Sequence, residues 1–383
     1  MTGVWTYPWT LYGEGVAAAC EELASKGVDK LAVSAHHHAI RVFQPRLSRP
    51  AFDGGPGGCY FAPSPARFED TPIQPVQAEV DGSADPLTEI VAVADEYGLK
   101  TTAWTYILHN PRLANAHPAF QIEDVFGNAY GHAFCLSHPE VRRYYAAVVA
   151  ECAARGINAI ELQGAKYPSV FHGQRLTAGI DARQVLTTDA DEQLFSQCFC
   201  DACRCAARKH DVDIDRAQTV VQKLIEQSMR RPGSESMALS DLVYERPILG
   251  DLFQFRNAVV DSLVEEIAEA AGDVAVNAYV RQVGPDWSSG LTLSTLERHV
   301  DRITHTCYVS DPNVARDRIR TLQRSVDLPL DAGVTIDPTV IDSKTSLTAV
   351  VDAIRAETDG QVSVFNHAMM TDEQLNWVSA LSE

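Results

Sequence analysis

One pattern repeats along the chain: an amphipathic helical stretch ends in a glycine, and a short apolar stretch follows it. The glycines of these repeats are Gly27, Gly98, Gly156, Gly272 and Gly360. Glycine suits a helix end because it adopts the left-handed conformation at little steric cost. An apolar run of about four to six residues is typical of a strand that is buried on both faces. The repeat therefore predicts helices that alternate with the strands of a parallel sheet.

Eight strands can be placed in this way, and a helical stretch follows each one. They are expected at about 4–9, 30–36, 101–107, 158–163, 273–279, 303–309, 328–334 and 361–367. Eight consecutive β/α units predict an α/β protein with the (β/α)8 TIM-barrel fold. A doubly wound open sheet is the alternative, but no glycine-rich phosphate loop follows any of the strands.

Three connections are much longer than a barrel needs. They cover about 39–84, 107–137 and 164–250, and each follows a predicted strand. In a barrel they would rise from the C-terminal face, where active sites lie, and form a lid or cleft. The 383 residues then form one barrel domain, 1–383, with insertions. A separate domain at 164–250 is the alternative, since this stretch carries helical patterns of its own.

The charge of the chain limits its partners. It has 51 Asp and Glu against 32 Lys and Arg, which gives a net charge of −19. Without a basic run, neither nucleic acid nor an anionic membrane is an expected partner. No export signal or long apolar run is visible, so we expect a cytoplasmic protein without a transmembrane helix. The acidic, lysine-poor composition fits either a halophile or a biased genome composition. Assembly into a homo-oligomer is neither predicted nor excluded by the sequence.

Alternation within the strands predicts which side chains face the barrel axis. On the fourth strand Ile160 and Leu162 should face the helices, and Glu161 and Gln163 should face the axis. Aromatic faces, amides and carboxylates at the mouth suit a sugar. The expected substrate-binding residues, from strand ends and loops, are His36, His38, Trp104, Tyr106, His109, Gln163, Lys166, His172, Asn277, Tyr279, Arg281, Asn366 and His367.

Glu161 is the candidate catalytic residue. A partly desolvated carboxyl group at a barrel mouth has a raised pKa and suits general acid/base catalysis. Its alternative role is structural, paired with an Arg or a buried amide. Glycoside hydrolysis needs a second carboxylate about 5 to 9.5 Å away, and Asp331 on the seventh strand is the first choice. Asp286 and Asp311 are alternatives, although Asp311 also fits a helix cap before a proline.

Three consecutive histidines, His36 to His38, end the second strand and suggest a metal-dependent alternative. At most His36 and His38 share a face, and with Glu161 they would serve a lyase, isomerase or hydrolase. The His-x-His motif that amidohydrolases carry on the first strand is missing here, because that strand is predicted to end at Trp9. Hydrogen bonding to substrate or structure is therefore the default role of these histidines.

A dense cysteine cluster contains Cys198, Cys200, Cys203 and Cys205. Zinc takes four thiolate or imidazole ligands, so the cluster is a candidate structural zinc site, to which His210 is a further donor. Reduced, buried thiols are the alternative. The chain has nine cysteines and no visible export signal, so a disulfide framework is not expected. No cofactor is required by the leading hypothesis.

Several of these segments resemble glycoside-hydrolase-like TIM-barrel proteins. The similar segments are Leu136-Ser137-His138-Pro139-Glu140-Val141-Arg142 before the strand with Glu161, Cys198-Phe199-Cys200 with Cys203, and Trp104 with His109-Asn110. The resemblance covers roughly residues 100–210 and implies a barrel fold with carbohydrate-active chemistry. The leading hypothesis is therefore hydrolysis of a glycosidic bond in a small molecule or oligosaccharide. A barrel that binds sugars without turnover is the third hypothesis, after glycoside hydrolysis and metal-dependent catalysis.

Overall fold

Eight parallel strands form a closed barrel in the computed structural model, which describes residues 1–171, 184–231, 237–281 and 287–381. The barrel closes because β1 pairs with both β2 and β13. The barrel strands are β1 (Thr2–Thr6), β2 (Lys30–His37), β6 (Lys100–Tyr106), β9 (Ala159–Gln163), β10 (Ala275–Val280), β11 (Arg302–Thr306), β12 (Leu330–Thr335) and β13 (Val362–Phe365). The predicted (β/α)8 fold is confirmed.

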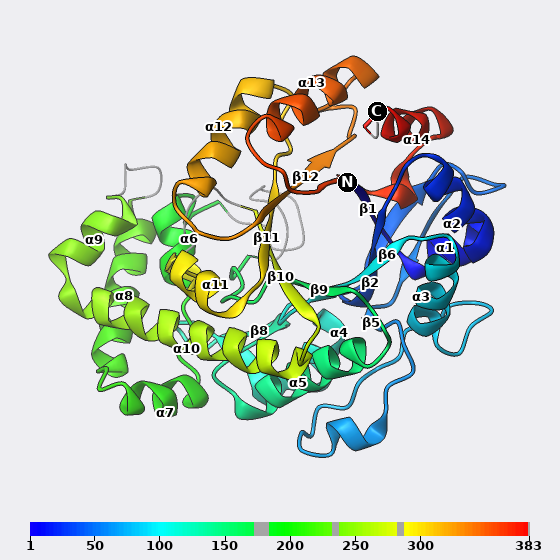
Figure 1. Ribbon diagram of the computed structural model, residues 1–383. Coiled ribbons are helices and arrows are strands. Elements are labelled where there is room, and N and C mark those ends of the chain that lie inside the picture. Colours follow the sequence, from blue (N-terminus) through cyan, green and yellow to red (C-terminus); the bar gives the residue numbers. More distant parts are fainter. Residues whose placement is uncertain (172–183, 232–236, 282–286, 382–383) are drawn as a thin grey trace.

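Helices follow the strands and surround the barrel (Figure 1). They are α1 (Pro8–Glu14) and α2 (Val16–Ser25) after β1, α3 (Pro86–Glu96) after β2, α5 (Pro139–Ala153) after β6, α10 (Pro247–Ala271) after β9, α11 (Leu293–His299), α12 (Pro312–Gln323), α13 (Lys344–Arg355) and α14 (Asp372–Ser379). None of the helices within the described ranges is both long enough and apolar enough to cross a membrane.

The three long connections carry the remaining elements. Between β2 and α3 lie the hairpin strands β3 (Ile40–Gln44) and β4 (Ala51–Gly55), and β5 (Gly58–Cys59), which pairs with β2. Between β6 and α5 lie α4 (Pro111–Ala116), β7 (Gln121–Glu123) and β8 (Ala129–Phe134). Between β9 and α10 lie α6 (Asp189–Phe195), α7 (Asp201–Lys209), α8 (Ile214–Arg230) and α9 (Leu239–Glu245). All three begin at C-terminal strand ends.

The first strand ends earlier than the sequence predicted. Strand β1 ends at Thr6, and α1 begins at Pro8, so Trp9 lies in a helix. Proline favours the first helical position because its missing N–H group has no partner there in any case. The other barrel strands lie within three residues of their predicted bounds.

The alternation predicted for β9 is confirmed. Ile160 and Leu162 are buried in the large apolar core that lies between the strands and the helices. Glu161 instead hydrogen-bonds to Trp5 on β1, so its side chain points into the barrel. The Trp5 ring also packs closely against β12, where a Cβ added at Gly333 would meet it at 2.8 Å.

Candidate functional site

A cavity of about 520 Å³ opens at the C-terminal ends of β6, β9 and β10. Its volume is in the range of pockets that hold a small ligand. Six of the expected substrate-binding residues line it: Tyr106, His109, Gln163, Lys166, Tyr279 and Arg281. Burial raises the pKa of Tyr279 to about 12, so its phenol stays protonated as a hydrogen-bond donor. The cavity therefore gathers phenols, an amide, an imidazole and charged groups around one space.

Glu161 lies in the barrel interior and does not line this cavity. Its side chain is fully buried. The Trp5 indole donates to one carboxylate oxygen at 2.6 Å, and the Thr304 hydroxyl donates to the other at 3.0 Å. Gln163, two residues further along β9, is the inward residue that reaches the cavity, and its amide oxygen accepts a hydrogen bond from Trp104 at 2.6 Å.

Asp331 lies at the other end of the barrel. It is the second residue of β12, and Arg302, the first residue of β11, pairs with it at 2.9 Å. The backbone N–H of Gln361, just before β13, donates to the same oxygen at 2.7 Å. The first residues of the parallel strands lie at the N-terminal face of the barrel, opposite the C-terminal face. The prediction that Asp331 supplies a carboxylate at the mouth is therefore wrong. Asp311 caps α12 by accepting from the Asn313 N–H, and Asp286 lies outside the described residues.

A β-bulge in β2 corrects the orientation predicted for His36. The pairing with β6 shifts between Ser34 and His36, and one extra residue reverses the sides of all residues that follow. His36 therefore faces α5, where its ring nitrogens contact the Tyr106 carbonyl at 2.8 Å and the Tyr144 hydroxyl at 3.2 Å. Burial lowers the pKa of His36 to about 4, so the imidazole is neutral near pH 7.

His37 takes the inward place that His36 was expected to occupy. Its ring packs against the rings of Tyr7, Trp104 and Tyr106, and burial lowers its pKa well below the usual value. His38 packs against Tyr106 and His109, beside the cavity. A neutral His37 among aromatic rings is a packing residue and a hydrogen-bonding group.

The mouth over β1, β2 and β13 is aromatic and filled. Tyr7 stacks on Trp9 with ring centroids 4.4 Å apart, and Trp9 packs against Tyr60 from the first insertion. The side chain of His367 is fully buried; Thr6 and Arg46 contact its two ring nitrogens.

Of three other expected substrate-binding residues, two lie away from the cavity and one lies outside the described residues. Asn366 is 1% exposed, and its side-chain oxygen accepts from the Ala368 N–H. Asn277 is buried on β10, in register with Glu161. His172 lies outside the described residues.

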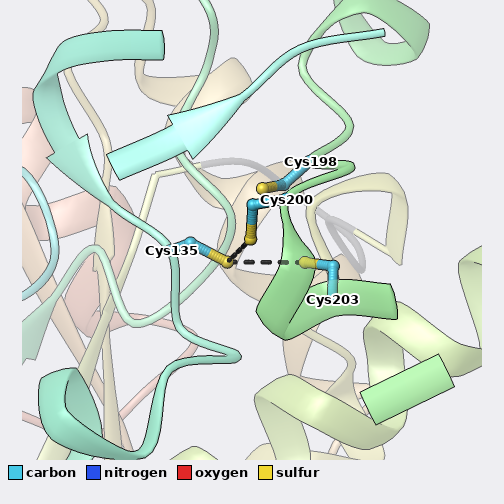
Figure 2. Close-up of side chains that lie close together, drawn as sticks. All are labelled: Cys135, Cys198, Cys200 and Cys203. Carbon is cyan, nitrogen blue, oxygen red and sulfur yellow. Dashed lines mark hydrogen bonds between the residues drawn. The ribbon is translucent and has the colours of Figure 1, made fainter. Parts of the chain in front are cut away.

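The cysteine cluster forms with one member different from the predicted set. Cys135, Cys198, Cys200 and Cys203 are buried with their sulfur atoms within 4.8 Å of one another (Figure 2). Cys205, two residues after Cys203 on α7, is exposed. Including Cys205 was wrong because a helix turns side chains two residues apart to different faces. His210, the residue directly after α7, packs against Phe255 and is not part of the cluster.

Two N–H groups point at sulfur atoms of the cluster. The Arg256 guanidinium donates to Cys203 Sγ at 3.0 Å, and the Glu123 N–H donates to Cys198 Sγ at 3.4 Å. Hydrogen bonding with Cys135, Cys198 and Cys203 holds the pKa of Cys200 far below its usual value, whereas burial raises the pKa of Cys135 and of Cys198. The side chain of Arg256 is fully buried, and no carboxylate pairs with it among the described residues.

Solved structures with this fold include several glycoside hydrolases. The β-galactosidase of the psychrophilic Marinomonas ef1 matches with a TM-score of 0.58 at 12% identity, over 100% of this chain and 58% of that one. The β-galactosidase of Bacillus circulans sp. alkalophilus gives 0.55 at 11%, over 100% and 55%. The α-L-fucosidase isoenzyme 2 of Paenibacillus thiaminolyticus gives 0.53 at 13%, over 95% and 44%.

The chain has the fold of these enzymes. The resemblance to glycoside-hydrolase-like barrels is thus confirmed for the fold. The chain spans little more than half the length of the two β-galactosidases and less than half that of the fucosidase. No family model and no curated protein sequence matches it.

Sequence reasoning missed several residues of the cavity wall. The carboxylates of Asp189 and Glu192 line the cavity from α6, and Tyr167 lines it from the loop after β9. The sequence did hold a signal for α6, because Thr188 and Asp191 form a capping box at its start. Nothing in the local pattern indicated that this helix would turn its first residues toward the barrel mouth.

Proposed function

We propose that the protein is a carbohydrate-active hydrolase that cleaves a glycosidic bond in a small glycoside or oligosaccharide, with Glu161 as the general acid/base. The observation that supports this function most is the cavity at the C-terminal face of a barrel whose fold glycoside hydrolases share. Phenols, an amide and charged groups around one space suit a ligand with many hydroxyl groups. The likeness in fold alone does not specify the sugar.

Glu161 acts in this proposal from one layer below the cavity floor. In this structure both of its oxygens are bonded, to Trp5 and to Thr304. Protonation of a leaving group therefore requires the Trp5 indole to move aside when substrate binds. The second carboxylate would come from the cavity wall, where Asp189 and Glu192 lie, rather than from Asp331.

A panel of nitrophenyl glycosides and neutral oligosaccharides tests the reaction. Glu161→Gln keeps the size and the hydrogen-bonding shape, so the expected loss in kcat is about 100-fold or more with the fold retained. Glu265→Gln, on the exposed face of α10, is the matched control and should keep full activity. Unchanged turnover in Glu161→Gln would refute the role of this residue. Loss of turnover in Glu192→Gln alone would assign the general acid/base role to Glu192 in the cavity wall.

Binding without turnover is the second candidate, and one observation favours it. The polar residue that β9 presents to the cavity is Gln163, whose amide is neither an acid nor a base near pH 7, while the carboxylate of Glu161 is buried. The same panel separates the two candidates. Heat of binding without product release from any sugar would favour the binding protein, whereas product release abolished by Glu161→Gln would favour the hydrolase.

We also propose that Cys135, Cys198, Cys200 and Cys203 hold a structural zinc ion. Tetrahedral zinc with Zn–S bonds of about 2.3 Å places its sulfur atoms about 3.8 Å apart. In the structure Cys135 Sγ lies 3.4 Å from Cys203 Sγ and 3.6 Å from Cys200 Sγ, so the spacing fits this geometry. The N–H groups that point at two of the sulfurs would stabilise the thiolate charge.

Metal content of the purified protein tests this site. We expect about one zinc per chain by elemental analysis, released with a thiol-reactive mercurial. Cys135→Ser should lose the metal, and Cys205→Ser, whose thiol is exposed outside the cluster, should retain it. A metal-free protein that takes up neither Zn²⁺ nor Cd²⁺ would contradict the proposal.

A further inference from the structure

The four cysteines lie in the same two chain segments that build a wall of the cavity. His132 lines the cavity and comes three residues before Cys135. Gln197 lines it too and directly precedes Cys198. The first segment follows β6 and the second follows β9, and the cluster is where they meet. A metal bound there would tie together two insertions that are otherwise separate in sequence.

Arg256 connects this cluster to a third part of the wall. The guanidinium, from α10, donates at 3.0 Å to Cys203 Sγ and at 3.1 Å to the Tyr167 hydroxyl. It also donates to the Cys198 carbonyl and lies 4.8 Å from the centre of the Tyr167 ring. Tyr167 lines the cavity, and its backbone N–H donates at 2.8 Å to the carbonyl of Ser289, another lining residue.

The charge of Arg256 makes this connection sensitive to the metal. A buried cation needs a counter-charge, because transfer from water to the protein interior is costly. Four thiolates around Zn²⁺ carry a net charge of −2, which Arg256 partly neutralises. Without the metal no ion would hold the four sulfur atoms, and with them the contacts of Arg256 to Cys203 and to the Cys198 carbonyl, in one fixed arrangement. A shift of Arg256 would remove its hydrogen bond to the Tyr167 hydroxyl, which would keep its contact with Ser137 Oγ at 3.1 Å.

We infer that metal binding at the four-cysteine site sets the shape of the substrate cavity, through Arg256 and Tyr167. The metal would touch no substrate; Arg256 and Tyr167 are positioning residues. This inference rests on the proposed zinc site and is independent of any role for Glu161. By linkage, a ligand that requires the ordered wall would also bind the metal-loaded protein more tightly than the metal-free one.

Hydrogen exchange measured by mass spectrometry tests the inference on the full chain. Peptides covering 164–171 and 287–291 report on the wall, and peptides covering β12 and α13 serve as a remote reference. We expect the wall to exchange about tenfold faster after metal removal, as a local opening. Tyr167→Phe should keep the metal, because the hydroxyl is not a ligand, yet should speed wall exchange even in the metal-loaded protein.

Three outcomes would overturn the inference. In the first, the wall exchanges at the same rate with and without metal although elemental analysis shows that the metal is gone. In the second, the β12 and α13 peptides lose protection equally, because the metal would then hold the whole fold. In the third, neither Zn²⁺ nor Cd²⁺ binds, which would remove the zinc proposal as well and is distinguished by the metal content.

Discussion

The two sides of the barrel mouth are built in different ways. Over β9 and β10 the strands end beneath an open cavity, whose wall comes from the second and third insertions and from the segment after β10. Over β1, β2 and β13 the mouth is filled by stacked aromatic rings and by a buried network of Arg46, Glu14 and His367. One side holds an open cavity, and the other side is packed with side chains. The four predictions below test this division.

The largest effect is expected at the cysteine cluster. Cys135→Ser should lower the free energy of unfolding by about 4 kcal/mol or more, because metal binding contributes directly to folding. Cys205→Ser should change it by less than about 0.5 kcal/mol, as an exposed substitution. Urea denaturation of the metal-loaded proteins measures both. Equal stability of the two variants would show that the cavity side needs no metal.

The next effect is expected on the filled side, at Arg46. Arg46 pairs with Glu14 at 2.5 Å, and the two side chains are only 7% and 15% exposed. Arg46→Met would leave the carboxylate of Glu14 buried without its partner, at a cost of about 3 kcal/mol. Arg41→Met, an exposed residue of the same hairpin, is the control. Similar denaturation midpoints for the two variants would mean that this network contributes little.

Buried histidines should give both sides a dependence on pH. Burial lowers the pKa of His36 and of His305 to about 4, whereas their unfolded value is about 6.5. The unfolded chain therefore binds more protons between these values, and stability falls as the pH drops from 6.5 to 4. Each histidine should contribute about 1 to 3 kcal/mol to this loss.

His305→Phe tests the pH prediction because only Nδ1 of His305 contacts a partner, the Val280 carbonyl at 3.0 Å, and its Nε2 atom has no hydrogen-bond partner among the described residues. Its free energy of unfolding, measured in urea at several pH values, should fall less steeply below pH 6.5 than that of the original chain. An identical slope in both proteins would show that His305 takes up its proton without cost when folded.

The smallest effect is expected where the two sides meet. Trp104 packs with Tyr7 on the filled side, and its indole donates to Gln163, which lines the cavity. Trp104→Phe removes this one hydrogen bond and should cost about 1 kcal/mol. Calorimetry with a sugar identified from the panel should show weaker binding as well. A change in stability without any change in sugar binding would show that this contact with the filled side does not affect the cavity.

The sequence was sufficient for the fold because one local pattern of helix, glycine and strand occurs five times and the remaining strands fit the same alternation. Helix ends at glycine, apolar strands and the place of the insertions all follow from near neighbours in the chain. The inward direction of Glu161 followed from simple alternation in the same way.

The site was harder to predict because it depends on exceptions to that pattern. The bulge in β2 exchanged His36 for His37, and no residue between Ser34 and His36 signals it. Asp331 was expected at the mouth, but β12 begins at Leu330, so this carboxylate lies near the start of its strand, where Arg302 pairs with it. Cys135 joined the cysteine cluster from 63 residues away, a contact that only the folded insertions create.

The pairing of β1 with β13 has a consequence for how the chain is made. The barrel closes between the first strand of the chain and the last, so the sheet keeps two open edges until residue 365 has been synthesised. Such a long-range contact slows folding and exposes strand edges to other nascent chains. The same pairing brings Met1 against Val362, and the Thr2 hydroxyl donates to the Leu381 carbonyl at 3.4 Å, so the two ends of the described chain lie close together. Joining them and opening the chain in a surface loop should therefore give a circular permutant that folds to the same barrel.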